Sequence, residues 1–402
     1  MSYKKAQKIY ADVINEIKES GLYKDEYIIT SPQGGEISVQ FPQGSINKNV
    51  LNFCSNNYLG LASHKDVIAA AKNGLDNYGF GLSSVRFICG TQDLHKKLEE
   101  QVSSFLGKED TILFSSCFDA NAAIFEVLLN EEDAIFSDQL VHASIIDGER
   151  LAKKVERLIY PHSDMVELEK MLANSNSRIK MIVTDGVFSM DGDMAKLDEI
   201  VTLAEKYEAL VFVDDSHATG LIGNTGRGTP EYFNVIDKVD IISTTFGKAL
   251  GGANGGCISG KKEIISLLRQ RARPYLFSNT LMPAVVSATI KVLEIIDKDF
   301  TLKEKLIRMS EYWRASLINL GFDIKNGNTP IIPVMLYDAK LAQDFARELF
   351  NEGVYVRGFF YPVVAQGQAR IRTQISASLT EEDLEKALFA FKKVGIKLGV
   401  IK

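Results

Sequence analysis

The chain has 402 residues, of which 46% are apolar and 24% are charged, a composition typical of a globular protein with one large and one smaller domain. Its net charge of −6 and its lack of a basic stripe interleaved with aromatic residues argue against nucleic acid as the main partner. The four cysteines are widely separated and form no C-x-x-C pair, so the sequence indicates neither a metal site nor a disulfide framework.

The N-terminal segment predicts a helix that serves as a packing arm. Its apolar residues recur at helical spacing: Ile9, Val13, Ile14 and Ile17. No apolar leader precedes the helix, and no run in the chain approaches the ~18 apolar residues of a membrane span, so we expect a cytoplasmic protein. A strand pattern broken by a turn follows over residues 27–41.

Two adjacent asparagines, Asn56 and Asn57, follow the apolar run 50–54. Such a pair is typical of a turn, but an amide in this position can also bind a carboxylate. The residues alone leave both interpretations open. The glycine-rich stretch 79–90 lacks the spacing of a dinucleotide fingerprint and follows no predicted strand, so a Rossmann site is not indicated.

The junction at residues 115–121 has the features of a phosphate site. It lies between the buried-strand run 111–114 and a helical stretch that continues to Leu129. Small polar residues at such a junction leave backbone N–H groups unpaired at the positive end of the helix dipole. A serine that caps a helix gives the same pattern without binding anything.

Further short apolar runs alternate with helical segments: 133–136, 157–160, 181–184, 210–213 and 241–244. This alternation predicts a mostly parallel α/β sheet with helices on both faces, in which ligands bind beyond the carboxyl ends of the strands. Side chains capable of chemistry follow most of the runs: Asp138 and His142, Asp185 and Ser189, Asp214 and His217, and Lys248. Packing alone does not explain so many coincidences.

Lys248 lies where the β-branched run 241–245 enters a glycine-rich turn. Because Ala249 follows it, the segment does not match a P-loop. A lysine at a strand-to-helix turn can be without function, but the side chains at the neighbouring strand ends favour a Schiff-base lysine at the mouth of the sheet.

This set of side chains suits catalysis with pyridoxal 5′-phosphate (PLP), in which a lysine binds the cofactor covalently. Asp214 ends an apolar strand and needs a cationic partner, which a protonated pyridine nitrogen supplies. His217 can reach the phenolic oxygen of the ring, and His142 can stack on its face. The other three histidines are expected to be structural: His64, His95 and His162.

The C-terminal third predicts a smaller α+β domain. A helical pattern runs from residue 283 to 317, and strand-rich sequence begins at Pro330. Two further helices are expected near 341–351 and 384–398, and Tyr361-Pro362 predicts a turn near the substrate entry.

Three stretches resemble the α-oxoamine synthase family of fold-type-I PLP enzymes: 185–192, 214–217 and 245–252. Five more segments extend the resemblance over nearly the whole chain: 85–92, 115–121, 142–148, 273–279 and 367–374. The resemblance implies a fold-type-I PLP-dependent transferase with a mostly parallel central sheet. The expected parts are an N-terminal helix and arm (1–50), a large PLP-binding domain (51–285) and a small C-terminal domain (286–402).

The resemblance also implies a role for each matching residue. The catalytic residues would be Lys248, His142, Asp214 and His217. The cofactor would also be held by the backbone N–H groups of Cys117 and Phe118, by Ser189 and Thr245, and by Ser278 and Asn279 of a partner subunit. Asn56 and Arg372 fall where the family binds the substrate carboxylate. A guanidinium pairs well with a carboxylate, and Arg370, on the same strand face, stays open as an alternative to Arg372.

The reaction implied by the resemblance is the condensation of glycine with acetyl-CoA to give 2-amino-3-oxobutanoate and CoA, in threonine and glycine metabolism. The expected assembly is a homodimer with a shared active site. Two alternatives stay open. One is a decarboxylating relative that joins a longer acyl thioester to alanine, serine or glycine, and the other is a non-catalytic α/β binding module. The sequence carries no readable code for the length of the acyl chain.

Overall fold

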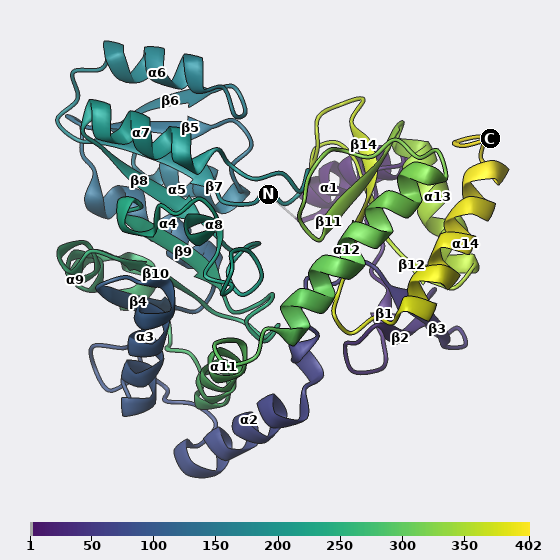
Figure 1. Ribbon diagram of the computed structural model, residues 1–402, viewed down its shortest axis with the longest axis horizontal. Helices are drawn as coiled ribbons and strands as arrows, with labels where there is room; N and C mark the ends of the chain where they lie inside the picture. The colour runs from purple at the N-terminus through teal and green to yellow at the C-terminus, as the bar shows by residue number, and fades with distance from the viewer. Residues whose placement is uncertain (1–2) are drawn as a thin grey trace.

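A seven-stranded sheet lies at the centre of the larger part of the molecule (Figure 1). In this computed structural model, which describes residues 3–402, the strand order is β4-β10-β9-β8-β7-β5-β6. The strands are β4 (Asp110–Phe114), β5 (Ala134–Asp138), β6 (Glu156–Tyr160), β7 (Lys180–Asp185), β8 (Ala209–Asp214), β9 (Ile241–Thr245) and β10 (Gly256–Gly260). Met1 and Ser2, the start of the predicted N-terminal arm, lie outside the described residues.

The sheet is mostly parallel, as predicted. The pairs β5–β6, β5–β7, β7–β8 and β8–β9 are all parallel, so the carboxyl ends of these strands meet at one edge. The sequence did not predict β10, which runs antiparallel to both β4 and β9. Gly256 and Gly260 end this five-residue strand, and glycine is depleted in strands, so the segment resembles a turn when only its sequence is considered.

Helices cover both faces of the sheet, as predicted. Successive residues of a strand point to opposite faces, so Ile182 joins one apolar layer while Met181 and Val183 join the other. The first layer includes residues of α3 (Asp93–Leu106), α6 (Met165–Asn174) and α7 (Leu197–Tyr207). The second includes residues of α4 (Cys117–Leu128), α5 (Ala143–Leu151), α9 (Lys262–Arg271) and α10 (Arg273–Phe277).

The remaining strands form two small sheets beside the large one (Figure 1). The four-stranded sheet consists of β1 (Ile28–Ile29), β2 (Glu36–Gln40), β3 (Lys48–Asn52) and β12 (Val354–Tyr355). The three-stranded sheet consists of β11 (Ile331–Tyr337), β14 (Ala369–Gln374) and β13 (Gly358–Phe359). Because β12 pairs with β3, the N-terminal strands and the C-terminal third are joined through one sheet.

The other helices are α2 (Lys65–Tyr78), the short α8 (Thr229–Tyr232), α11 (Pro283–Ile296), α12 (Thr301–Asn319), α13 (Ala339–Asn351), α14 (Glu381–Lys397) and two 3₁₀ turns, η1 (Leu61–Ser63) and η2 (Ile236–Lys238). The helical pattern expected over residues 283–317 is therefore two helices. Just before the second, Asp299 Oδ1 accepts a hydrogen bond of 2.9 Å from the Thr301 backbone N–H, a local turn that accounts for the break.

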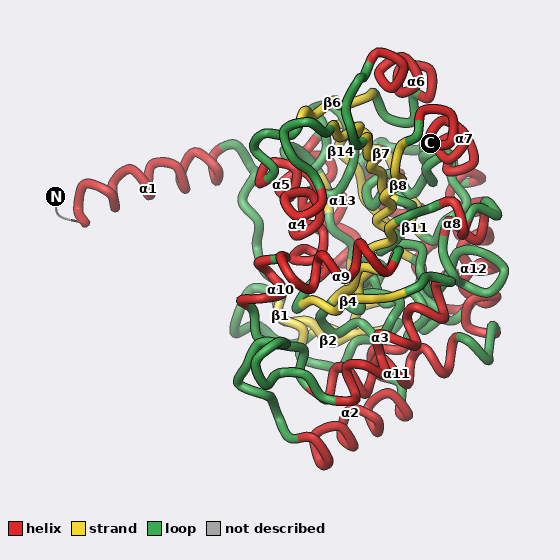
Figure 2. The backbone as a smooth tube through the Cα atoms, turned by 90° about the vertical axis from the view of Figure 1, so that its left-hand side faces the viewer, coloured by secondary structure: helices red, strands yellow, loops and turns green. Residues whose placement is uncertain are grey.

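The predicted N-terminal helix is present as α1 (Tyr3–Glu19), which projects away from the rest of the chain (Figure 2). None of its residues is buried, and its apolar stripe is exposed along its length. The helix therefore does not pack against its own chain. None of the helices within residues 3–402 combines the length and apolar content needed to cross a membrane.

Candidate active site

Four strands of the large sheet deliver polar side chains to one edge. β5, β7 and β8 end in Asp138, Asp185 and Asp214, and Lys248 follows β9 by three residues. The register of β7 against β8 places Asp185 beside Asp214. The parallel sheet thus brings together residues that are up to 110 positions apart in the sequence.

Asp214 is almost completely buried and is held in place by two donors. Its Oδ2 accepts a hydrogen bond of 2.6 Å from Asn121 Nδ2, and its Oδ1 accepts one of 3.0 Å from the Ser216 backbone N–H. Within residues 3–402, Asp214 forms no ion pair. A buried carboxylate needs a cationic or strongly donating partner and has acceptor sites to spare, so a protonated ring nitrogen fits this position.

Lys248 is half-buried at the same edge. Burial lowers the pKa of its amine, and the nearby acidic groups, of which Asp214 is the strongest, offset only part of this effect. A lowered pKa increases the fraction of neutral amine, which is the form that attacks a carbonyl and accepts a proton. Lys248 forms no ion pair in the described part of the chain, so its amine is available for that chemistry.

His142 and Asp185 both precede Asp214 in the sequence and are joined by a hydrogen bond. The His142 backbone N–H donates to Asp185 Oδ1 over 3.1 Å, while its ring contacts Ser144 Oγ over 2.7 Å through Nδ1. The ring is exposed, so a face remains open for stacking. Burial, reinforced by the charge of Asp214, raises the pKa of Asp185 well above its usual value, and Asp185 therefore favours its neutral form.

The predicted phosphate site is the start of α4. Its N-cap, Ser116, accepts the Asp119 backbone N–H over 3.0 Å, and Cys117 and Phe118 are the first two residues of the helix. N–H groups at these two positions have no carbonyl partner within the helix. A Cβ on Gly256 would lie 2.6 Å from the Cys117 backbone, so only glycine lets β10 approach the cradle this closely.

Two other residues predicted to hold the cofactor, Asn279 and Thr245, lie near this cradle. Ser115 Oγ, directly before the N-cap, donates to the Asn279 carbonyl of its own chain over 2.9 Å. Thr245 is the last residue of β9 and accepts the Gly247 N–H over 3.1 Å. The contribution of Ser278 and Asn279 from a partner subunit stays a prediction.

Arg372, on β14, lies at the other end of the site. Its Nη1 donates to the Ser189 carbonyl over 2.9 Å, its Nη2 donates to Gln374 Oε1 over 3.3 Å, and its guanidinium lies 4.6 Å from the centre of the Phe359 ring. Its Nε is buried without a partner. Asn56 accepts a hydrogen bond from Gln374 Nε2. Arg372 and Asn56, the two predicted carboxylate-binding residues, thus both contact the side-chain amide of Gln374.

The neighbouring Arg370 is engaged elsewhere. Its guanidinium forms a buried ion pair with Asp191 and donates to the Met190 carbonyl over 3.1 Å, while Lys325 Nζ lies 2.7 Å from the same Asp191. Arg370 therefore holds the loop 186–195, which contains Ser189. This geometry favours Arg372 over Arg370 for binding a carboxylate.

His162 also holds this loop. Its Nδ1 lies 2.9 Å from Asp138 Oδ1 and its Nε2 lies 2.8 Å from Asp193 Oδ2. Burial lowers the pKa of His162, but the hydrogen bonds and charges of the two carboxylates outweigh it and raise the pKa to about 10. The expected structural role is consistent with this position, which links β5 to the loop that carries Ser189.

The raised pKa makes part of the stability depend on pH. A group whose pKa is raised on folding stabilises the protein fully below its unfolded pKa, about 6.5 for histidine, and loses that effect as the pH rises to the folded value of about 10. We expect His162→Gln to destabilise the protein at pH 6, with the difference from wild type shrinking toward pH 10. Urea unfolding of both proteins over this pH range measures the difference in stability. A difference that grows with pH would contradict a charged His162 between Asp138 and Asp193.

Three residues that shape the site were not predicted: Asn121, Tyr58 and Gln374. Asn121 lies on α4 and orients Asp214. Gln374 is a fully buried polar residue at the end of a strand, and Tyr58 follows the Asn56-Asn57 pair. A polar side chain in an otherwise buried strand is a signal that could have found Gln374, since such a group must have partners.

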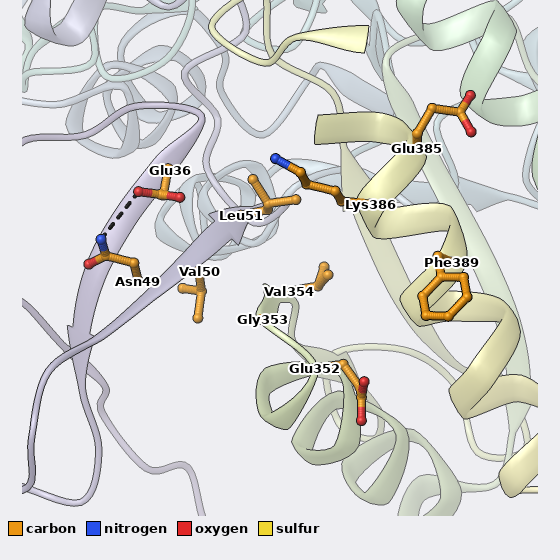
Figure 3. A pocket seen from close by; sticks show the side chains of 10 residues that line it. All are labelled: Glu36, Asn49, Val50, Leu51, Glu352, Gly353, Val354, Glu385, Lys386 and Phe389. Atoms are coloured by element: carbon orange, nitrogen blue, oxygen red, sulfur yellow. Dashed lines mark hydrogen bonds between the residues drawn. The ribbon is translucent and has the colours of Figure 1, made fainter. Parts of the chain in front are cut away.

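A hollow of about 620 Å³ lies away from this site, between β3, β12 and α14 (Figure 3). Glu36 contacts Asn49 there over 3.3 Å, and Glu352 pairs with Lys393 over 2.7 Å. None of the predicted site residues lines it. The hollow is therefore separate from the predicted site.

Comparisons with known proteins agree with the geometry. The family model described as "Aminotransferase class I and II" matches residues 48–391. The 2-amino-3-ketobutyrate coenzyme A ligase of Escherichia coli is 54% identical over 98% of both chains. The 8-amino-7-oxononanoate synthase of Thermosipho melanesiensis is 47% identical over 98% of this chain and 99% of that protein. A solved serine palmitoyltransferase from S. paucimobilis with a bound PLP–myriocin aldimine has a TM-score of 0.92 at 28% identity and full coverage of both chains.

Proposed function

We propose a specific reaction for this chain, which belongs to the aminotransferase class I and II family. The protein is a PLP-dependent glycine C-acetyltransferase, which joins glycine to the acetyl group of acetyl-CoA and releases 2-amino-3-oxobutanoate and CoA. The observation that carries the proposal is the 54% identity to a 2-amino-3-ketobutyrate coenzyme A ligase over 98% of both chains. The amino keto acid in that name is the same compound as the product of the proposed reaction.

The residues at the sheet edge fit PLP. The buried Asp214, which forms no ion pair within residues 3–402, suits a protonated ring nitrogen. The available amine of Lys248 suits covalent attachment, and the start of α4 suits the phosphate. His142 would cover the face of the ring, His217 would contact the phenolic oxygen, and Ser189 would lie beside it. When bound, PLP supplies an electron-withdrawing ring that stabilises negative charge at the α-carbon of an amino acid.

Lys248 has the central role in moving a proton. Its amine would accept the proton from the α-carbon of glycine, and burial lowers the pKa of the amine, which increases the fraction in the neutral form that can do so. Asp214 would keep the ring nitrogen of PLP protonated, and Asn121 donates a hydrogen bond that orients the Asp214 carboxylate.

Arg372 and Asn56 would bind the carboxylate of glycine. The guanidinium of Arg372 is buried, which strengthens its attraction for an anion, and its Nε lacks a partner. The carboxylate would thereby be fixed while the α-carbon faces Lys248. Arg370 would act indirectly by holding the loop 186–195.

Variants of the two arginines separate these roles. Arg372→Lys loses the planar fork and is expected to raise KM for glycine by about 10- to 100-fold, the effect of losing hydrogen bonds to a charged group. Arg370→Lys removes a guanidinium that contacts Asp191 and the Met190 and Gln368 carbonyls, and it is expected to lower the free energy of unfolding by about 1–3 kcal/mol with a smaller change in KM. Steady-state kinetics and urea unfolding of both variants measure this. Equal increases in KM would contradict the assignment.

We further propose a homodimer in the cytoplasm whose subunits share the active site. Support comes from apolar side chains exposed around the phosphate cradle, such as Phe118 (46% exposed) and Phe277 (70% exposed). The apolar residues of α1 are exposed as well. Ser278 and Asn279 of the partner subunit would complete the phosphate site. The proposal keeps the three-part division at residues 1–50, 51–285 and 286–402, for which limited proteolysis is the test.

A panel of acyl-CoA thioesters and amino acids tests the reaction. Glycine labelled with ¹³C in the carboxyl carbon distinguishes the two candidates, because condensation with acetyl-CoA keeps the label in the product and a decarboxylating reaction releases it as carbon dioxide. Since β-keto acids lose carbon dioxide by themselves, the product is trapped at once by borohydride as the hydroxy acid. We expect acetyl-CoA with glycine to give the highest kcat/KM and a labelled product.

The alternative rests on the 47% identity to an 8-amino-7-oxononanoate synthase. It predicts preference for a longer acyl thioester, a different amino acid such as alanine, and loss of the carboxyl carbon. That outcome would replace the proposed reaction while leaving the assignment of PLP in place.

A further inference from the structure

A buried chain of hydrogen bonds joins Arg372 to His217 across the site. Arg372 Nη2 donates to Gln374 Oε1, Gln374 Nε2 lies 2.8 Å from Tyr58 Oη, and Tyr58 Oη lies 2.8 Å from His217 Nδ1. Tyr58 and Gln374 are fully buried, so each of their polar atoms depends on this chain for its partners. The chain connects the end of the site that would bind the carboxylate to the end that would bind the cofactor.

The direction of these hydrogen bonds follows from their chemistry. A guanidinium only donates, so the oxygen of the Gln374 amide must face Arg372 and its NH₂ group must face away. This NH₂ group then donates to Tyr58 Oη and to Asn56 Oδ1. Tyr58 Oη accepts from Gln374, and its own proton therefore goes to His217 Nδ1.

The direction of these hydrogen bonds determines the tautomer of His217 and the orientation of the Asn56 amide. His217 Nδ1 accepts a hydrogen bond, so the proton of the neutral ring lies on Nε2. The opposite tautomer would leave two donors facing each other and the Tyr58 proton buried without an acceptor. Burial, with the charges of Lys248 and Arg372, lowers the pKa of His217 well below its usual value, which keeps the ring neutral.

Gln374 also orients the side-chain amide of Asn56. Its Oδ1 is occupied by Gln374, so its NH₂ group is the part of the amide that is left to meet a ligand. An NH₂ group donates to a carboxylate, whereas the amide oxygen would repel one. Gln374 thus decides which end of Asn56 a substrate meets.

We propose that Gln374 is a positioning residue that fixes both ends of the active site at once, by holding His217 as an Nε2–H donor toward the cofactor and Asn56 as an NH₂ donor toward the substrate carboxylate. The identity of the two ligands rests on the proposed function. The placement of the protons rests only on the hydrogen bonds of this chain.

The variant Gln374→Glu tests the proposal because it replaces the NH₂ group with a second acceptor of nearly the same size. Tyr58 would then donate its proton to the new carboxylate, and His217 Nδ1 would lose its donor. The proton of the His217 ring would therefore move from Nε2 to Nδ1. Asn56 would turn its NH₂ group toward the new carboxylate and its oxygen toward the substrate. We expect KM for glycine to rise by about 10- to 100-fold, as for a lost hydrogen bond to a charged group.

Nitrogen-15 NMR of histidine-labelled, PLP-loaded enzyme measures the tautomer directly. The chain has five histidines, and a His217→Asn variant identifies the signals of His217. We expect the Nε2–H tautomer in wild type and the Nδ1–H tautomer in Gln374→Glu. Gln343, a half-buried amide on α13 that donates to the Gly21 carbonyl, lies outside this chain of hydrogen bonds. The variant Gln343→Glu is the control and should leave both the tautomer and KM unchanged.

A second variant covers the case in which Gln374→Glu does not fold. Tyr58→Phe removes the donor to His217 but leaves the Gln374–Asn56 contact, so we expect a mixture of His217 tautomers with little change in KM for glycine. The Nδ1–H tautomer in wild type, or an unchanged tautomer in Tyr58→Phe or in folded Gln374→Glu, would overturn the proposal. If wild type does not accept glycine but the tautomers behave as expected, the reaction is wrong and the positioning role stands.

Discussion

Lys248→Ala is expected to lower kcat/KM for glycine and acetyl-CoA by about 10⁴-fold or more. Alanine removes both the amine that binds the cofactor covalently and the base that takes the proton from the α-carbon, and general acid–base catalysis alone contributes about 10²- to 10⁴-fold. The loss should appear in kcat, because the residues that would bind the carboxylate of glycine lie on other elements, Asn56 after β3 and Arg372 on β14. Release of CoA, followed with a thiol reagent, measures it.

Lys340→Ala is a suitable control, because Lys340 is exposed on α13 and its one ion pair within residues 3–402 is with Asp344. It should keep wild-type activity. Turnover by Lys248→Ala within tenfold of wild type would show that another group removes the proton.

Asp214→Asn is expected to lower kcat by about 200- to 5,000-fold. Asparagine keeps the shape of the side chain but not its charge, so a buried cation would be left without a partner at a cost of about 3–5 kcal/mol. Each 1.36 kcal/mol on the barrier corresponds to a factor of about ten in rate, which gives the expected range. Single-turnover kinetics with saturating glycine separates this effect from substrate binding.

Asn121→Ala provides the graded comparison. It removes one hydrogen bond from Asp214 but leaves the carboxylate and its bond from the Ser216 N–H, so an effect of about tenfold or less is expected. If Asp214→Asn lowered the rate no more than Asn121→Ala does, the negative charge of Asp214 would have no special role.

The large sheet could be predicted because its parallel strands are buried on both faces. The run 210–213 is entirely apolar and the run 181–184 is apolar except for Thr184, and these runs lie within the strands β8 and β7 of the structure. β10 could not be found in this way, because it is short, ends in glycines and pairs antiparallel with β4 and β9, which are more than 100 positions apart in the chain.

The candidate site was predictable to the extent that its residues end strands. Asp214 and Lys248 could be placed together because the carboxyl ends of parallel strands share one edge. The partner of Gln374, Tyr58, is 316 positions away, and no local pattern reports a contact of that kind. The choice between Arg370 and Arg372 likewise needed the positions of Asp191 and Ser189, which are set by the fold of a loop.

Covalent attachment of PLP to Lys248 is the central step of the proposed chemistry, and borohydride reduction tests it most directly. Reduction of the PLP-loaded enzyme, followed by proteolysis and mass spectrometry, identifies the lysine that carries the cofactor. We expect one modified peptide, containing Lys248, and none in Lys248→Ala. A modified peptide with a different lysine, or an enzyme that binds no PLP, would contradict this assignment.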